Sequence, residues 1–160
     1  MKECFWKNGI SFLCTRCSAC CRYEQGFVFL VESDREAILK TLNIDYETFV
    51  RNYCRWVPFS DGYEYLSLTE KQNYDCIFWD NGCSIYKARP LQCSSYPFWP
   101  NALQSLDVWR AVTADCSARI RIENGSTEKD PSIPFFSAAK ILEIRNKQIN
   151  AQKIRRRGAI

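Results

Sequence analysis

The stretch Cys14-Thr-Arg-Cys17-Ser-Ala-Cys20-Cys21 carries four thiols within eight residues, and we expect it to decide how this chain folds. Gaps of two residues let a tight turn bring neighbouring sulfurs to one centre, as in zinc knuckles and in ferredoxins that hold a 4Fe–4S cluster. Because adjacent side chains tend to diverge, one of Cys20 and Cys21 should serve a second centre or another side of the first. The spacing alone does not distinguish a zinc site from an iron–sulfur site.

Four further cysteines, Cys76, Cys83, Cys93 and Cys116, lie downstream. Residues 76–86 are interpreted as a hairpin around an Asn-Gly turn, across which the first two of these cysteines could meet. The predicted metal ligands are therefore Cys14, Cys17, Cys20, Cys21, Cys76, Cys83, Cys93 and Cys116. They could form two four-ligand centres, or one centre with spare thiols.

Two cysteines stand apart from these groups. Cys54 follows a predicted helix face and is interpreted as a buried structural thiol, whereas Cys4 stays unassigned. Arg89 lies between two candidate ligands, so we expect it to donate hydrogen bonds to thiolates or to backbone carbonyls near the site.

The composition limits the chemistry of the site. The 160 residues include ten cysteines and no histidine, so a soft-metal site must use thiolates, with at most a carboxylate added. Clustered thiols oxidise unless they are ligated, which disfavours buried free cysteines. The net charge of +4 would be cancelled by eight thiolates around two divalent zinc ions, so it is no nucleic-acid signal by itself.

The chain also lacks targeting signals that would change this interpretation. No apolar run reaches the roughly 18 residues of a membrane span. Residues 1–7 lack the apolar segment of a secretory signal, so we expect a cytoplasmic, reducing location. Such a location favours metal ligation over disulfides.

The pattern predicts a small single α+β domain organised around the all-cysteine site. Strands are expected at residues 63–68 and 108–114, and a helix at 34–42 should begin with a capping box formed by Ser33 and Glu36. An amphipathic helix is expected over 134–155, with Phe135, Ala138, Ile141, Leu142 and Ile149 facing inward. We divide the chain into a metal-binding domain, 1–125, and a C-terminal helix with a basic tail, 126–160.

The basic tail, residues 153–157, reads Lys-Ile-Arg-Arg-Arg. We interpret it as a solvated helix end whose cations are favoured by the helix dipole, and we do not expect a nucleic-acid partner. The expected partner is a metal ion, and a protein partner stays open.

Two blocks resemble a known family. Phe12-Leu-Cys14-Thr-Arg-Cys17-Ser-Ala-Cys20-Cys21-Arg22 is similar to the signature of the CxxCxxCC, or YkgJ-like, cysteine cluster proteins. The block Cys76-Ile-Phe-Trp-Asp-Asn-Gly-Cys83-Ser-Ile-Tyr86-Lys-Ala-Arg89-Pro90-Leu-Gln-Cys93-Ser-Ser-Tyr96-Pro97-Phe98 resembles their second motif. The resemblance covers about residues 12–116.

This resemblance implies chelation of zinc or iron by the cysteines of both blocks, and an iron–sulfur centre is among the forms it allows. Cys116 matches less well because the Pro-Gly often found after it is absent, and Ser94 replaces an arginine common in the family. The family also includes flagellin lysine N-methylases. The alternative function is therefore an iron–sulfur-dependent enzyme, either methylase-like or redox-active.

Overall fold

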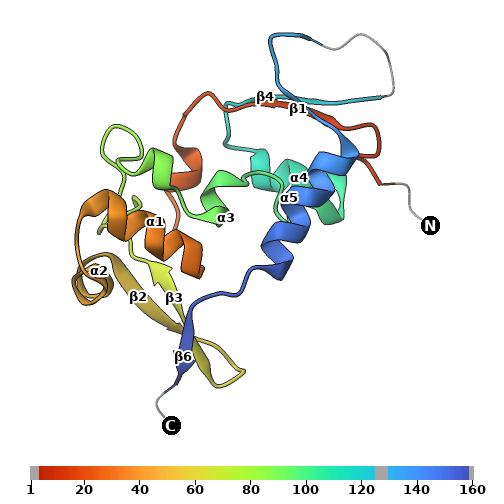
Figure 1. Cartoon of the computed structure of the whole chain (residues 1–160). Coiled ribbons are helices and arrows are strands. Elements are labelled where there is room, and N and C mark those ends of the chain that lie inside the picture. The colour runs from red at the N-terminus through yellow and green to blue at the C-terminus, as the bar shows by residue number, and fades with distance from the viewer. Residues whose placement is uncertain (1–3, 125–129, 159–160) are drawn as a thin grey trace. The chain divides into compact units, whose positions relative to one another are not determined.

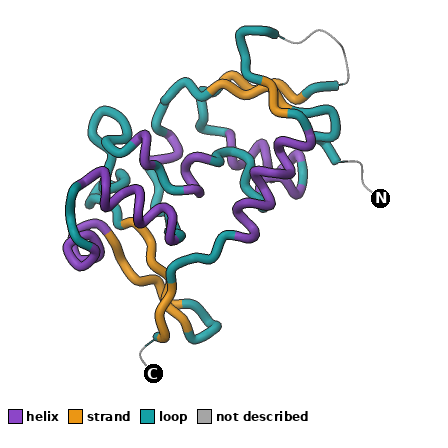
Figure 2. The backbone as a smooth tube through the Cα atoms, in the orientation of Figure 1, coloured by secondary structure: helices purple, strands orange, loops and turns teal. Residues whose placement is uncertain are grey.

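The computed structural model describes residues 4–124 and 130–158, and it has the predicted α+β class (Figures 1 and 2). The described residues form five α-helices and two three-stranded antiparallel sheets. Contacts divide the chain into a first unit, residues 1–19 and 95–150, and a second unit, residues 20–94 and 151–160. The predicted boundary at residue 125 lies outside the described residues. No described helix has the length and apolarity to cross a membrane.

The sheet of the first unit has strand β1 (Ile10–Leu13) between β4 (Arg119–Ile122) and β5 (Phe135–Phe136). The 3₁₀ turn η3 (Ala102–Gln104) and helices α4 (Leu106–Thr113) and α5 (Ala138–Asn150) complete the unit. Its buried apolar core comprises Ile10, Phe12, Phe98, Ala102, Leu103, Trp109 and Ile141. Removing these side chains from water stabilises the unit by roughly 25 cal/mol per Å² of apolar surface.

Helix α4 replaces the strand predicted at residues 108–114, so that prediction was wrong. The hydroxyl of Ser105 accepts a hydrogen bond from the backbone N–H of Val108 at 3.2 Å and caps the helix. Trp109 is buried on one face of α4 while Val108 stays exposed, which is a helical pattern rather than a strand alternation. The sequence interpretation overlooked Ser105 as an N-cap.

Helix α5 covers only the middle of the helix predicted over 134–155. Ile141 is fully buried, as predicted, but Leu142 and Ile149 are 40% and 52% exposed. The inward face is therefore rotated from the predicted one. Residues 155–157 form strand β6 instead of a helix end, so the interpretation of the basic tail was also wrong.

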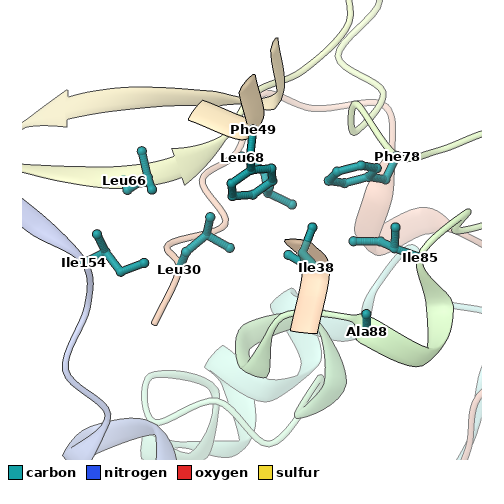
Figure 3. Close-up of a cluster of buried hydrophobic side chains, with 9 residues drawn as sticks. All are labelled: Leu30, Ile38, Phe49, Leu66, Leu68, Phe78, Ile85, Ala88 and Ile154. Carbon is teal, nitrogen blue, oxygen red and sulfur yellow. The ribbon is translucent and has the colours of Figure 1, made fainter. Parts of the chain in front are cut away.

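The second unit is built on strand β3 (Tyr63–Leu68), as predicted, between β2 (Cys54–Pro58) and β6 (Arg155–Arg157). Helices α1 (Glu32–Leu42), α2 (Tyr46–Tyr53) and α3 (Leu91–Ser94) and the 3₁₀ turns η1 (Ala19–Cys21) and η2 (Tyr86–Ala88) surround it. Its core consists of Leu30, Ile38, Phe49, Leu66, Leu68, Phe78, Ile85, Ala88 and Ile154, drawn from helices, strands and loops (Figure 3).

Helix α1 matches the prediction except at its first turn. It begins at Glu32, and Asp34 rather than Glu36 accepts a hydrogen bond from the backbone N–H of Val31, at 3.0 Å. The carboxylate of Asp34 thereby satisfies a backbone donor that the helix leaves free. The predicted capping box was therefore wrong in both its residues, Ser33 and Glu36.

The predicted hairpin over 76–86 is also not a strand pair. Its residues form turns in which a single bridge joins Trp79 to Cys83, so Cys83 pairs with tryptophan and not with Cys76. Asn81 and Gly82 do adopt positive φ values, 49° and 143°, as an Asn-Gly turn requires.

Candidate metal centre

The predicted ligands fall into two sets, one within each unit. The first unit contains Cys14, Cys17 and Cys116, which we call the first set. The second unit contains Cys20, Cys21, Cys76, Cys83 and Cys93, which we call the second set. All ten cysteines are free thiols. The motif at residues 14–21 is thus divided between Ala19 and Cys20, immediately before the pair that we expected to diverge.

Strand pairing brings two members of the first set together. β1 ends at Leu13 opposite Arg119, the first residue of β4, so the segments 14–17 and 116–118 continue side by side. The Sγ atoms of Cys17 and Cys116 lie 4.0 Å apart. Nearby, the hydroxyls of Thr15 and Ser117 share a hydrogen bond of 2.8 Å. The sulfur of Cys14 accepts a backbone hydrogen bond from Arg16 and is exposed.

The two thiols of this pair differ in acidity. Burial alone would raise the pKa of Cys17, but hydrogen bonds from the Ala19 and Ser117 backbones, the Ser117 side chain and Cys116 lower it overall. Burial raises the pKa of Cys116. Cys17 is therefore the readier of the two to become the thiolate that a metal requires.

In the second set, Cys20 and Cys21 converge. Turn η1 brings their Sγ atoms to 3.7 Å, so the predicted divergence of this pair was wrong. The reason is that a 3₁₀ turn does not alternate side chains as an extended chain does. A hydrogen bond from Cys21 lowers the pKa of Cys20 to about 7, although burial opposes this; a backbone hydrogen bond at Cys20 and, last, the charge of Arg89 also lower it. The same hydrogen bond raises the pKa of Cys21.

The other thiols of the second set lie on three different segments. Cys76 donates its backbone N–H to the carbonyl of Cys21 at 2.8 Å, which fixes the two chain segments together. Cys83 follows the turn at 80–82, and Cys93 lies in α3. Burial raises the pKa of all three thiols, and the charges of Cys76, Cys20 and Cys83 add to the rise at Cys93.

Arg22, next to the motif, fastens it to the segment that carries Cys76. Its Nε donates to the carboxylate of Asp75 at 2.9 Å, and its guanidinium lies 3.7 Å from the ring centroid of Trp79. Asp75 is 3% exposed and also accepts from the Asn73 amide at 2.9 Å. Sequence reasoning missed this ion pair, although opposite charges flanking Cys21 and Cys76 were a signal for it.

Helix α3, which carries Cys93, is held by two further side chains that the sequence did not single out. Asp34 accepts from the backbone N–H of Leu91 at 2.9 Å. Gln92 accepts from the backbone N–H of Phe29 at 3.1 Å and donates to the carbonyl of Phe27 at 2.6 Å. A helix of four residues has little stability alone, so these contacts set its position.

Arg89 lies over the ring of Tyr86, with 3.7 Å between the guanidinium carbon and the ring centroid. Its charge lowers the pKa of Cys20 and opposes the rise at Cys83. Its buried Nε has no hydrogen-bond partner within the described part of the chain. The structure thus shows an electrostatic influence of Arg89 on the thiols, while the predicted hydrogen bonds to them remain a prediction.

The sulfur spacings can be compared with what a metal requires. Zinc binds thiolate at about 2.3 Å in a tetrahedron, which puts two sulfurs on one ion about 3.8 Å apart. The 3.7 Å and 4.0 Å pairs fit this spacing, and an all-thiolate donor set suits zinc or iron. Among residues 4–124 and 130–158, however, no three His, Cys, Asp or Glu side chains converge on a common point. The cysteine sulfurs are therefore spaced for a soft metal in two pairs, and not as a group of three or four.

The chain matches the CxxCxxCC family, described as "Putative zinc- or iron-chelating domain", over residues 13–124. The chain belongs to this family. The uncharacterized protein MJ0661 of Methanocaldococcus jannaschii is 31% identical over 94 residues, which are 57% of this chain and 47% of that protein. The chain therefore spans about half the length of this relative. No solved structure matches the chain.

Proposed function

We propose that this CxxCxxCC protein chelates zinc or iron through cysteine thiolates. The ligands of this proposal are the first set, Cys14, Cys17 and Cys116, and the second set, Cys20, Cys21, Cys76, Cys83 and Cys93. The observation that carries the proposal is the convergence of two sulfur pairs, at 3.7 Å and 4.0 Å, that involve motif cysteines. The family description agrees with it.

The pairs are spaced for ligation rather than for disulfide bonds. A disulfide joins its sulfurs at about 2.05 Å, whereas these sulfurs lie at distances that one metal ion would impose. Free thiols at such spacing persist in a reducing compartment, so we place this chemistry in the cytoplasm. A metal there would also protect the pairs from oxidation.

The pair spacing bears on which metal is bound. Two thiolates on one ion suit zinc, a single iron, or an iron of a 2Fe–2S centre, where four cysteines serve two irons. In a 4Fe–4S cluster four cysteines serve four irons, so no iron takes a pair. We therefore propose a centre in which each metal ion receives at least two thiolates, with zinc as the first candidate and iron as the second.

Completion of the second set requires Cys76, Cys83 and Cys93 to approach the pair at Cys20 and Cys21. For Cys76 the backbone is already bonded to that of Cys21, so rotation of its side chain can bring the thiol closer. Metal binding must order the thiols, and the entropy cost of doing so is lower when the backbone is already held in place. A lower cost raises the affinity for the metal.

The test is anaerobic purification followed by elemental analysis and a UV–visible spectrum. Stoichiometric zinc in a colourless protein, or stoichiometric iron in a coloured one, is expected. A broad absorbance near 400 nm that bleaches on reduction would identify an iron–sulfur centre. Absence of stoichiometric metal after anaerobic handling would refute the proposal.

Cysteine variants assign the ligands. Cys21→Ser and Cys83→Ser should lower metal content through the second set, and Cys17→Ser should do so through the first. Cys54→Ser is the matched control, because Cys54 begins strand β2 opposite Leu68 and belongs to neither thiol set. Equal metal loss in Cys54→Ser and Cys21→Ser would show that the ligands are misassigned.

A further inference from the structure

The outer face of the second unit's sheet combines exposed aromatic rings with cations. In Figure 1, β6 lies beside the strand pair β2 and β3. Arg155 is opposite Tyr65, and Arg157 is opposite Tyr63. Because cross-strand partners share a face of the sheet, these arginines and tyrosines lie on one side. Ile154 is buried, so Arg155 points away from the core by the alternation of a strand.

Aromatic rings form a continuous cluster on this side. Phe27 stacks on Phe29 with 5.7 Å between ring centroids, and Phe29 meets Phe59 edge to face at 5.5 Å. Phe59 meets Tyr65 in the same way at 5.0 Å. Phe27 and Phe59 are 43% and 47% exposed, which is unusual for rings of this size in a cluster.

Positive charges border the same rings. The ammonium of Lys153 lies 4.9 Å from the ring centroid of Phe29, and the guanidinium of Arg155 lies 4.2 Å from that of Tyr63. Lys153 and Arg155 are exposed. One nearby carboxylate, Glu64, is held by Arg156 at 2.6 Å. Asp61 accepts from the hydroxyl of Tyr65, also at 2.6 Å. Glu70 lies near Phe27 as well and is paired at 3.1 Å with Arg55, whose guanidinium lies 4.8 Å from the Phe27 ring centroid.

We propose that this aromatic–basic face, made by Phe27, Phe29, Phe59, Tyr65, Lys153 and Arg155, binds single-stranded nucleic acid. Bases stack on the exposed rings of this face, Phe59 above all, while the phosphates contact Lys153 and Arg155. Aromatic rings beside a cationic track are the combination by which sheet surfaces bind single strands without sequence readout. The inference does not depend on the metal, and it reverses the sequence-based expectation that nucleic acid is not a partner.

The chemistry of the face favours this occupant over other polyanions. An anionic membrane is bound by an apolar surface free to enter the lipid, whereas these rings are packed against one another, stacked or edge to face. A phosphopeptide is held by arginines converging on one phosphate, whereas Lys153, Arg155 and Arg157 are spaced along a strand. Alternate residues of a strand lie about 7 Å apart, which suits a row of phosphates.

The test measures the fluorescence anisotropy of a labelled 15-nucleotide oligo(dT) with the anaerobically purified full chain. Phe59→Leu should weaken binding about tenfold, because it keeps an apolar side chain but removes the stacking ring. Arg155→Gln should reduce the slope of log K against log salt by about 0.7. Circular dichroism checks that both variants are folded, and Phe27→Leu provides a second stacking variant.

Matched controls lie in the first unit. Arg110→Gln removes an exposed arginine and Phe135→Leu an exposed ring, so both should leave binding unchanged. Absence of binding at low salt, equal weakening by Arg110→Gln and Arg155→Gln, or unchanged binding in both Phe59→Leu and Phe27→Leu would each overturn the proposal. Binding to phosphatidylserine vesicles but not to oligo(dT) would overturn it in favour of a membrane.

Discussion

At the scale of single residues, the site depends on a side chain that ligates nothing. Arg22 joins the motif to the Cys76 segment through Asp75 and Trp79. Both the ion pair and the ring contact hold the backbone that presents Cys21, whose carbonyl also accepts from Cys76. Residues that orient ligands in this way affect metal affinity although they do not touch the metal. Arg22 is thus a positioning residue.

Arg22→Gln should weaken metal binding about tenfold or more, because it releases the segment that carries Cys76. Arg22→Lys should restore part of the affinity, since lysine keeps the charge opposite Asp75 but not the planar guanidinium. Competition with a chromogenic zinc chelator measures both variants. The matched control is Arg35→Gln, because Arg35 also pairs with a carboxylate and lies over a tyrosine ring. Equal affinity loss in the Arg22 and Arg35 variants would contradict the positioning role.

At the scale of elements, short polar caps decide where helices begin. Asp45 accepts from the backbone N–H and the hydroxyl of Thr48, at 2.8 Å and 2.9 Å, at the start of α2. These hydrogen bonds lower the pKa of Asp45. The carboxylate therefore stabilises the folded state at pH values above its unfolded-state pKa, and this contribution is lost as pH falls through the lower folded-state pKa.

Asp45→Ala should accordingly lower the urea midpoint at pH 7, and the gap between variant and parent should narrow below about pH 4. Urea titrations at pH 7, 5 and 3 measure this gap. Glu36→Ala is the comparison, because Glu36 is exposed and does not cap α1, where Asp34 takes that role. A gap that stays constant from pH 7 to pH 3 would rule out capping by an ionised Asp45.

Helix α5 offers a second element-scale prediction. Ile141→Ala should lower the free energy of unfolding by about 2–5 kcal/mol, since it leaves a cavity at a fully buried position. The adjacent Leu142→Ala should cost far less, because Leu142 is 40% exposed. Denaturant unfolding of the two variants measures the difference. A larger loss of unfolding free energy in Leu142→Ala than in Ile141→Ala would show that Leu142 faces inward, as the sequence predicted.

At the scale of the whole molecule, two hydrophobic cores support two sets of thiols, and each core lies within its own unit. Cys76 and Cys83 pack against the core of the second unit, but the motif cysteines belong to neither core, so apolar packing does not by itself close the thiol sets. Metal binding to the folded chain should therefore add stability beyond that of the cores, because a ligand that binds only the folded state stabilises it.

Removal of metal by anaerobic dialysis against a chelator should lower the thermal midpoint, and zinc or iron should restore it. Differential scanning calorimetry of the loaded and stripped protein measures the shift. The Cys54→Ser variant, loaded and stripped in the same way, should show the same shift as the parent. Identical midpoints with and without metal would show that the metal does not contribute to folding.

Local sequence signals predicted a good part of this fold. The α+β class, helix α1 to within two residues and strand β3 over residues 63–68 are all confirmed. The hydrophobic periodicities of helices and strands, and the positions of Pro and Gly, are short-range features, so a single sequence reveals them. The strand predicted at residues 108–114 is wrong because these residues have a strand-like composition but form helix α4. The Ser105 cap and the burial of Trp109 favour the helix.

The sequence by itself determined the all-thiolate chemistry of the candidate site, because the chain has ten cysteines and no histidine. Only the tertiary structure decided which thiols meet. Cys17 lies beside Cys116, the weakest candidate by resemblance, because the β1–β4 register aligns their segments. Cys20 and Cys21 converge because the chain makes a 3₁₀ turn there. Ligand type is a property of the residue, whereas proximity depends on long-range pairing that spacing along the chain does not encode.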